Sequence, residues 1–154
     1  MATRKIITIG EDILRKKARR IDKIDDRILQ LIEDMKDTLA ESGNGIGLAA
    51  PQVGMLKRIF IVDLQDDQGL TVYINPEIIE TEGSQIGPEG CLSVPGKTGD
   101  VERPAKIKIR AQNEKGEIFE EEAEELRAVC ICHENDHLNG VLFPDRVKGA
   151  LTDV

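Results

Sequence analysis

The stretch that most constrains this chain is His133-Glu134-Asn135-Asp136-His137. On a helix, residues four positions apart lie on one face, one turn above each other, so His133 and His137 can bind one metal ion from the same side. Glu134 lies beside the first histidine, close enough to hold or deprotonate a water molecule on that metal. The pattern fixes only three positions, so its context decides between a metal site and an ordinary charged helix.

The context of this motif favours a metal-binding helix. The chain has no histidines other than these two. Residues 126–132 are mostly apolar and contain no Gly or Pro, which is typical of a half-buried helix. Asn139-Gly140 follows directly, and a Gly just past the last turn is a helix stop signal. We therefore expect a late helix that carries both histidines.

A catalytic site of this type needs a third protein ligand and one open coordination position. Cys130 shares the face of His133, but it precedes His137 by seven residues, a rise of roughly 10.5 Å. Metal–ligand bonds are only about 2.0–2.3 Å long, so these three side chains cannot share one ion. Cys132 points about 100° away from that face. Cys91, on a separate stretch, is geometrically free, and Asp and Glu side chains remain alternatives.

Length and composition indicate an ordinary globular protein. A chain of 154 residues, 40% apolar and 32% charged, is expected to form one domain over residues 1–154. No apolar run approaches the roughly 20 residues of a membrane span, and residues 1–7 do not read as a secretory signal. We therefore expect a cytoplasmic protein without a membrane partner. An odd count of three cysteines argues against a disulfide framework.

The net charge of −8 argues against extensive binding to a nucleic-acid backbone, and we expect no sequence-specific nucleic-acid contact. One basic cluster departs from this balance. We interpret it as a solvated surface, with a docking patch for an acidic or RNA-containing partner as the alternative. The cluster consists of Arg15, Lys16, Lys17, Arg19 and Arg20.

The hydrophobic pattern predicts an α+β fold. A long amphipathic helix is expected near the N-terminus, starting at Asp25 or Asp26 and ending at Gly43. Its apolar stripe consists of Ile28, Leu31, Ile32, Met35 and Leu39. Strands are predicted at residues 58–64, 71–74, 77–82, 106–110 and 117–122, and a strand or extended arm at 4–9. We expect antiparallel strands packed around the late helix.

Two glycine-rich stretches are predicted to be irregular loops. Residues 43–54 contain four glycines and match neither a phosphate-binding loop nor a dinucleotide fingerprint. Gln52 in this stretch can both donate and accept hydrogen bonds. Residues 87–96 are rich in Gly and Pro and contain Cys91. Residues 43–54 are compatible with two interpretations, a structural turn and a loop that contacts the substrate.

Three stretches together resemble the signature motifs of the peptide deformylase family, in the same order. They are residues 45–52 (GIGLAAPQ), 89–93 (EGCLS) and 133–137 (HENDH). The resemblance implies removal of the N-terminal formyl group from N-formylmethionine of newly made proteins, with release of formate. It also implies one divalent metal ion held by Cys91, His133 and His137. Fe²⁺ is the implied native ion, and Zn²⁺, Ni²⁺ or Co²⁺ can replace it.

The mechanism implied by this resemblance uses three further residues. A metal-bound water attacks the formyl carbon, and Glu134 is the general base and then the general acid. The side-chain amide of Gln52 and the backbone N–H of Leu92 are expected to hold the oxyanion. Arg103 is expected to pair with Glu89 in support of the metal site.

The resemblance also places the substrate. The methionine side chain is expected beside the late helix, and the peptide backbone beside Gly45 and Gly90 as an added strand. The implied substrate-binding residues are Gly45, Ile46, Gly47, Glu89, Gly90, Leu126, Val129 and Cys130. The implied partners are N-formylmethionyl nascent peptides, with a transient ribosome contact. The short stretch from Phe143 to Val154 departs from family members that have a long C-terminal helix, which weakens the expectation of a ribosome contact through the tail.

Two rival interpretations explain less of the sequence. An H-E-x-x-H endopeptidase would account for the late helix but not for the glycine-rich loop or Cys91. A non-catalytic structural metal site would use Asp136 or Cys132 as a fourth ligand. Nothing in a structural site requires Glu134 next to the first histidine.

Overall fold

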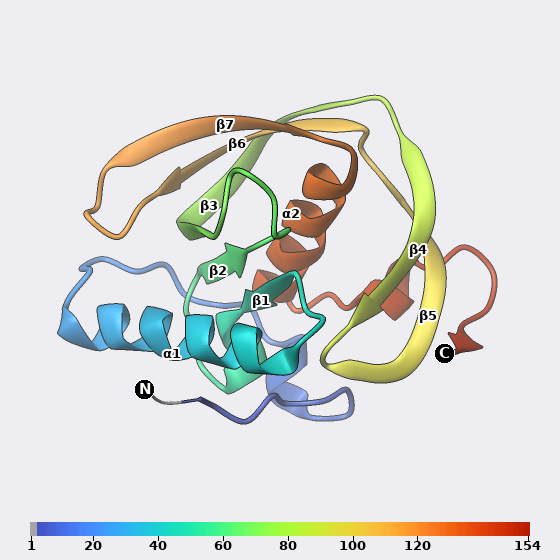
Figure 1. The fold of residues 1–154 in the computed structure, drawn as a ribbon, viewed down its shortest axis with the longest axis horizontal. Coiled ribbons are helices and arrows are strands. Elements are labelled where there is room, and N and C mark those ends of the chain that lie inside the picture. Colours follow the sequence, from blue (N-terminus) through green and yellow to red (C-terminus); the bar gives the residue numbers. More distant parts are fainter. Residues whose placement is uncertain (1–2) are drawn as a thin grey trace.

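The computed structural model describes residues 3–154, and Figure 1 shows their fold. The helical elements are two α-helices and three 3₁₀ turns, namely α1 (Asp26–Ser42), α2 (Glu125–Leu138), η1 (Asp12–Arg15), η2 (Ala50–Val53) and η3 (Phe143–Arg146). The strands are β1 (Gly47–Ala49), β2 (Ile59–Val62), β3 (Thr71–Glu82), β4 (Gln85–Cys91), β5 (Val94–Arg103), β6 (Lys106–Gln112), β7 (Ile118–Glu124) and β8 (Thr152–Asp153). The α+β class is confirmed.

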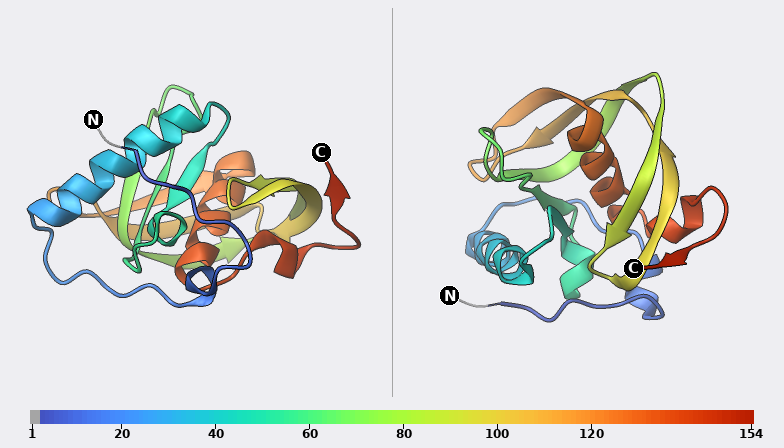
Figure 2. Two further views of the ribbon diagram at one scale, coloured as in Figure 1. Left: turned by 90° about the horizontal axis from the view of Figure 1, so that it is seen from below. Right: turned by 45° about the vertical axis from the view of Figure 1, so that its right-hand side comes forward.

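The strands form two antiparallel sheets. One has five strands in the order β1-β2-β3-β6-β7, and the other has three in the order β4-β5-β8. Figures 1 and 2 show α2 in the centre of the molecule, between the five-stranded sheet and the β4–β5 hairpin. The late helix is therefore enclosed by strands, as predicted.

The five-stranded sheet is covered by a helix on each face. In β2, Ile59 and Ile61 pack into the cluster that contains the apolar stripe of α1. Phe60 and Val62 point to the other face and pack into the cluster that contains Ile131 of α2. Side chains of a strand alternate between faces, so a strand covered on both faces is apolar at every position. This explains the continuous run Ile-Phe-Ile-Val in β2.

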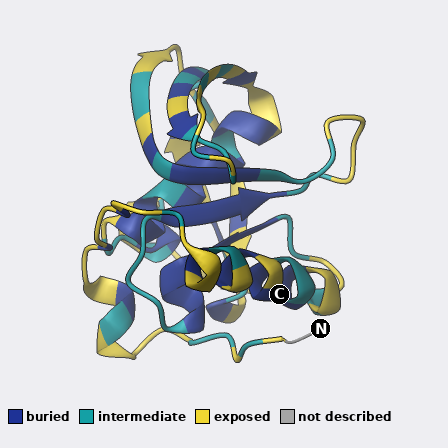
Figure 3. Ribbon diagram, turned by 90° about the vertical axis from the view of Figure 1, so that its left-hand side faces the viewer, coloured by how far each residue is buried: buried dark blue, intermediate teal, exposed yellow. Residues whose placement is uncertain are grey.

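The N-terminal helix has the bounds that its sequence predicts. The side chain of Asp25 accepts a hydrogen bond from the backbone N–H of Ile28 at 3.1 Å, which caps the first turn. Gly43 follows the last turn with φ of 81°, a conformation that favours glycine. Figure 3 shows the sheet-facing side of α1 as buried and its outer side as exposed.

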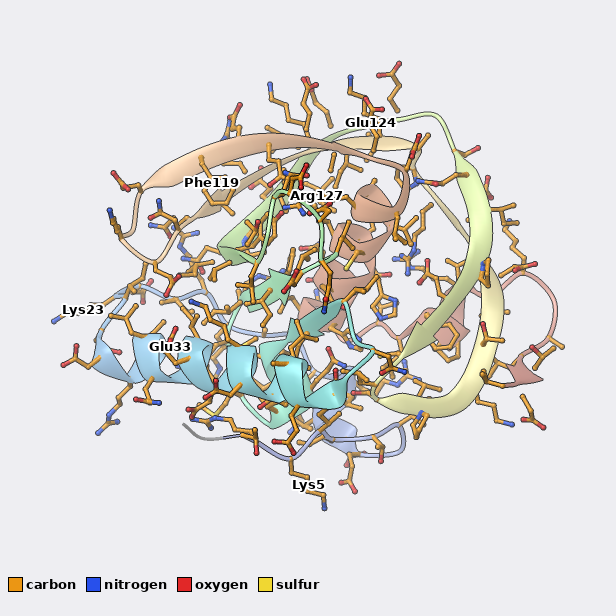
Figure 4. The ribbon with its side chains drawn as sticks, viewed as in Figure 1. Lys5, Lys23, Glu33, Phe119, Glu124 and Arg127 are labelled. Carbon is orange, nitrogen blue, oxygen red and sulfur yellow. The ribbon has the colours of Figure 1, made fainter. Side chains whose placement is uncertain are left out.

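The late helix α2 is anchored at both ends. Near its start, Arg127 (labelled in Figure 4) donates hydrogen bonds to Glu121 of β7 at 2.6 Å and to Tyr73 of β3 at 2.8 Å. At its end, Gly140 has φ of 76°, and the carbonyl of Leu138 accepts a hydrogen bond from the N–H of Ala18 at 2.8 Å. The expected helix and its stop signal are confirmed, and α2 is fixed to the five-stranded sheet near its start and to the segment that contains Ala18 at its end.

The prediction that residues 87–96 are irregular was wrong. They form most of a β-hairpin, in which β4 and β5 are joined by the two-residue turn Leu92-Ser93. The hairpin is possible because β4 is an edge strand, where a proline such as Pro88 is tolerated without a second ladder partner. Cys91 is consequently held at the end of a strand rather than on a free loop.

The prediction for residues 43–54 was wrong in part. Gly47–Ala49 forms strand β1 and pairs with β2, and Ala50–Val53 forms the 3₁₀ turn η2. Pairing along the edge of a sheet supplies backbone hydrogen bonds that the glycine content alone does not predict.

Residues 71–82 form one strand rather than two. The chain continues through Asn75-Pro76 with a register shift against β6, as in a β-bulge. Asn75 has φ of 50°, and its side-chain amide donates to the carbonyl of Ile21 at 2.8 Å. This long-range bond stabilises a backbone conformation that the sequence suggests as a break.

The described segments at the two ends of the chain pack against η2 and the β4–β5 hairpin. Residues 4–9 form an arm, in which the N–H of Ile7 donates to the backbone carbonyl of Gln52 and the N–H of Ile9 donates to the backbone carbonyl of Ser93, both at 2.7 Å. The C-terminal residues form η3 and β8 rather than a long helix, as expected. Among residues 3–154, no helix combines the length and the apolar character required to cross a membrane.

Packing of α1 against the sheet gives a direct test of this fold. Ile32 is 0% exposed, whereas Ile118 is 71% exposed. Replacing Ile32 with Ala is expected to lower the free energy of unfolding by about 2–5 kcal/mol, because it leaves a cavity. Ile118→Ala, the matched control, is expected to change it by less than about 0.5 kcal/mol. Urea denaturation measures both, and equal effects would contradict the packing of α1.

Candidate metal centre

Three side chains, one from β4 and two from α2, meet where the end of β4 approaches α2. Cys91 ends β4, while His133 and His137 lie one turn apart on α2. Their ligand atoms all lie within 4.8 Å of one another, and the Cys91 Sγ is 3.3 Å from the His137 Nε2. Ligands of one ion have about this spacing, because metal–ligand bonds are about 2.0–2.3 Å long. The fold thus brings the two histidines of α2 next to Cys91, which the sequence left as one of several candidates for the third ligand.

The donor set fits one transition-metal ion. A thiolate with two imidazoles suits iron, zinc, cobalt or nickel better than magnesium or calcium, which prefer oxygen. Within residues 3–154, the group contains neither Asp136 nor Cys132, so it offers three donor atoms rather than the four of a structural site. Burial lowers the pKa of His137 well below its ordinary value, which favours the neutral imidazole that binds metal.

A buried ion pair orients the first histidine. The Nδ1 of His133 lies 2.9 Å from the Oε1 of Glu89, and Arg103 donates to both oxygens of Glu89 at 2.8 and 2.9 Å. Burial acts to raise the pKa of Glu89, but hydrogen bonds from Arg103 and His133 outweigh it and lower this pKa to about 2. An ionised carboxylate only accepts, so Nδ1 carries the proton and Nε2 is left to bind metal.

Glu134 is buried next to the three donors. Its side chain is enclosed, and within residues 3–154 its Oε1 has no hydrogen-bond partner. Burial raises the pKa of Glu134 to about 7, which suits proton transfer near neutral pH. A Cβ on Gly47 would lie 2.7 Å from the Glu134 Oε2, so glycine at this position leaves room for the carboxylate.

Gln52 points its amide toward the cysteine. Its Nε2 lies 3.5 Å from the Cys91 Sγ and donates to the Ser93 Oγ at 3.0 Å, while its Oε1 accepts from the N–H of Ala49 at 2.9 Å. These contacts fix which end of the amide faces the site. Ser93 was missed by the sequence reasoning, although it stands two positions after Cys91. Leu92, in the turn of the hairpin, lines the adjoining pocket.

A pocket of about 600 Å³ opens beside these groups. Its walls include Cys91, His133, Glu134 and seven of the expected substrate-binding residues, namely Gly45, Ile46, Gly47, Glu89, Gly90, Val129 and Cys130. Leu126 is not among the lining residues, and it is 55% exposed. The expectation that Leu126 contacts the substrate therefore stays a prediction.

The pocket also has walls that the sequence did not indicate. Pro88, Pro95 and Lys97 come from the β4–β5 hairpin, and Val154 from the C-terminal segment. Val154 reaches the pocket because its N–H donates to the carbonyl of Gly96 at 3.0 Å. Only the pairing of the tail with β5 reveals this proximity, so no local sequence signal predicts it.

Comparison with known proteins agrees with this geometry. The family model described as polypeptide deformylase matches residues 3–152. A peptide deformylase of Clostridium botulinum is 59% identical over 146 residues, which cover 95% of this chain and 97% of that protein.

Two solved structures are also similar. A peptide deformylase of Thermotoga maritima superimposes with a TM-score of 0.92 and 41% identity, covering 97% of this chain and 100% of the other. A peptide deformylase of Synechococcus elongatus in complex with actinonin has a TM-score of 0.88 and 45% identity, covering 94% and 78% of the two chains.

The buried ion pair beside His133 gives the prediction for this site. Replacing Arg103 with Ala leaves the buried Glu89 carboxylate without its guanidinium, and it is expected to lower the free energy of unfolding of the metal-free protein by about 3–5 kcal/mol. Arg110 pairs with Glu120 on the exposed face of β6 and β7. Arg110→Ala is the matched control, with an expected cost below about 1 kcal/mol. Chemical denaturation of both variants measures the difference, and equal losses would show that the Arg103 pair is dispensable.

Proposed function

The chain belongs to the polypeptide deformylase family, and from this premise we propose which of its residues carry out the reaction. It is a metal-dependent hydrolase that removes the N-terminal formyl group from N-formylmethionine of newly made proteins. Hydrolysis breaks the formyl C–N bond, forms a C–O bond from water, and yields formate and a free α-amino group. We propose that residues 1–154 form one deformylase domain, supported by the family match over residues 3–152.

Cys91, His133 and His137 are the proposed metal ligands. The observation that carries this proposal is the meeting of their three donor atoms within 4.8 Å, next to the buried carboxylate of Glu134. We propose Fe²⁺ as the native ion, with Zn²⁺, Ni²⁺ or Co²⁺ as replacements, since a thiolate and two imidazoles suit each of them. Such an ion supplies Lewis acidity, which lowers the pKa of water and polarises a carbonyl oxygen.

Glu134 is the proposed general base and general acid. It takes a proton from the attacking water and returns it to the nitrogen of the leaving amine. Its burial between α2 and β1 supports this role. Bulk water is kept away from the carboxylate, so the carboxylate exchanges its proton with the reacting groups rather than with solvent.

Gln52 and Leu92 are the proposed donors to the oxyanion. The Nε2 of Gln52 faces Cys91, and its position is fixed by the bonds to Ser93 and Ala49. The backbone N–H of Leu92 is the second donor, from the turn next to Cys91. A fixed donor of this kind is typically worth about 3–4 kcal/mol to the transition state.

The pocket of about 600 Å³ is the proposed substrate site. Ile46, Val129 and Cys130 supply apolar surface for the methionine side chain. Gly45 and Gly90 allow the peptide backbone to approach from either side as an added strand. Binding of actinonin to the relative from Synechococcus elongatus supports a ligand site in this family.

The setting of the reaction follows from its substrate. We propose that the protein works in the cytoplasm and meets formylated nascent peptides in transient contact with the ribosome. The chemistry supports this, because new N-termini emerge there, and no described helix would hold the protein in a membrane.

The assay that tests this function measures formate release by protein purified without oxygen, with bound metal counted in the same sample. A short formyl-Met peptide is the substrate, and the same peptide without the formyl group is the control for backbone cleavage. We expect formate from the first peptide at one metal per chain, and an intact second peptide. Cleavage of the second peptide would point to an endopeptidase, and a tightly held metal without any turnover would point to a structural site.

A further inference from the structure

The buried ion pair beside His133 continues outward to the surface. Arg103 donates from its Nη1 to the Oδ2 of Asp136 at 2.6 Å. Arg146 donates from its Nε to the same oxygen at 2.7 Å, and from its Nη2 to the Oδ1 at 3.1 Å. Five side chains therefore form a row that runs outward from the metal centre. Its order is His133, Glu89, Arg103, Asp136 and Arg146, with charges that alternate from Glu89 outward.

The last member of this row comes from a separate element. Arg146 ends η3, the short turn that follows α2 and packs against the β4–β5 hairpin. The same turn contributes Phe143, whose buried ring stacks on the ring of His133 at a centroid distance of 6.1 Å. Phe143 therefore contacts a proposed metal ligand directly, whereas Arg146 connects to the same ligand through Asp136, Arg103 and Glu89, and neither residue lines the substrate pocket.

Exposure separates Arg146 from the rest of the row. Its side chain is 48% exposed, compared with 13% for Asp136 and 4% for Arg103. Arg146 thus covers the solvent side of Asp136. Without it, Asp136 is exposed to water and retains one guanidinium partner in this row, Arg103, which it shares with Glu89.

We propose that Arg146 is a positioning residue for the metal centre. By donating hydrogen bonds to both oxygens of Asp136, it holds Arg103 in the position from which the guanidinium binds both oxygens of Glu89. Glu89 in turn fixes the orientation of the His133 ring. This inference rests on the proposed function, because it assumes that His133 is a metal ligand. The role differs from that of an ordinary surface ion pair, which contributes little on its own.

The experiment measures how fast metal leaves the cobalt-loaded protein when excess chelator is added. Outer partners of metal-binding histidines typically affect metal affinity by about 10–100-fold, and Arg146 lies further out, so we expect release from Arg146→Ala about 3–10 times faster than from the unmodified protein. Arg146→Lys keeps the charge but cannot bind both oxygens of Asp136 as a guanidinium does, so an intermediate rate of metal release is expected.

Arg15→Ala is the matched control. Arg15 pairs with Asp145, the neighbour of Arg146 on the same turn, and is similarly exposed at 46%, but that pair is separate from the row that leads to His133. We expect its release rate to equal that of the unmodified protein. Unfolding of the metal-free proteins, measured in parallel, separates positioning of the site from loosening of the fold.

The outcomes are distinct. Faster release from Arg146→Ala alone, with metal-free stability like that of Arg15→Ala, supports the proposal. Equal release from both variants overturns it, and so does faster release that is matched by an equal loss of metal-free stability. If the unmodified protein holds no metal, the proposed function fails instead, so the two failures are distinguishable.

Discussion

The fork from Arg103 to Glu89 is the interaction on which the rest of this structure depends. It joins β5 to β4 within the hairpin, and through His133 and Asp136 it joins that hairpin to α2. A buried charge is costly unless it is fully paired, so the pair requires the complete set of partners. Because these partners come from three elements, satisfying them also sets the distance from the hairpin to the helix. That distance places Cys91 beside the two histidines.

The hydrophobic core supplies the frame around this polar row. The five-stranded sheet packs α1 on one face and α2 on the other, so α2 is held along its length before any metal binds. Small residues then leave space for the reacting groups. Gly47 admits the carboxylate of Glu134, and Gly45 fits where a Cβ would meet the Leu92 side chain at 2.9 Å. The rigid frame and the open glycine positions together produce a pocket that adjoins a buried site.

Local patterns predicted the parts of the structure that depend on local contacts. The period of a helix was enough to place His133 and His137 on one face, and the cap at Asp25 was readable from its side chain. Long-range pairing decided the rest. The hairpin of β4 and β5 was misread because its Gly and Pro content is typical of loops, yet the edge strand β4 tolerates Pro88, and Pro95 of β5 precedes the residues that pair with β8. Arg146 had no sequence signal, since its partner is brought close only by the turn η3.

The central claim is that Glu134 moves protons while Cys91, His133 and His137 hold the metal. The most direct measurement compares metal content and formate release for Glu134→Ala with those of the unmodified protein. The account predicts an unchanged metal content and a turnover reduced by about 100- to 10,000-fold, the usual contribution of a general acid–base. A folded, metal-loaded variant with full activity would contradict it.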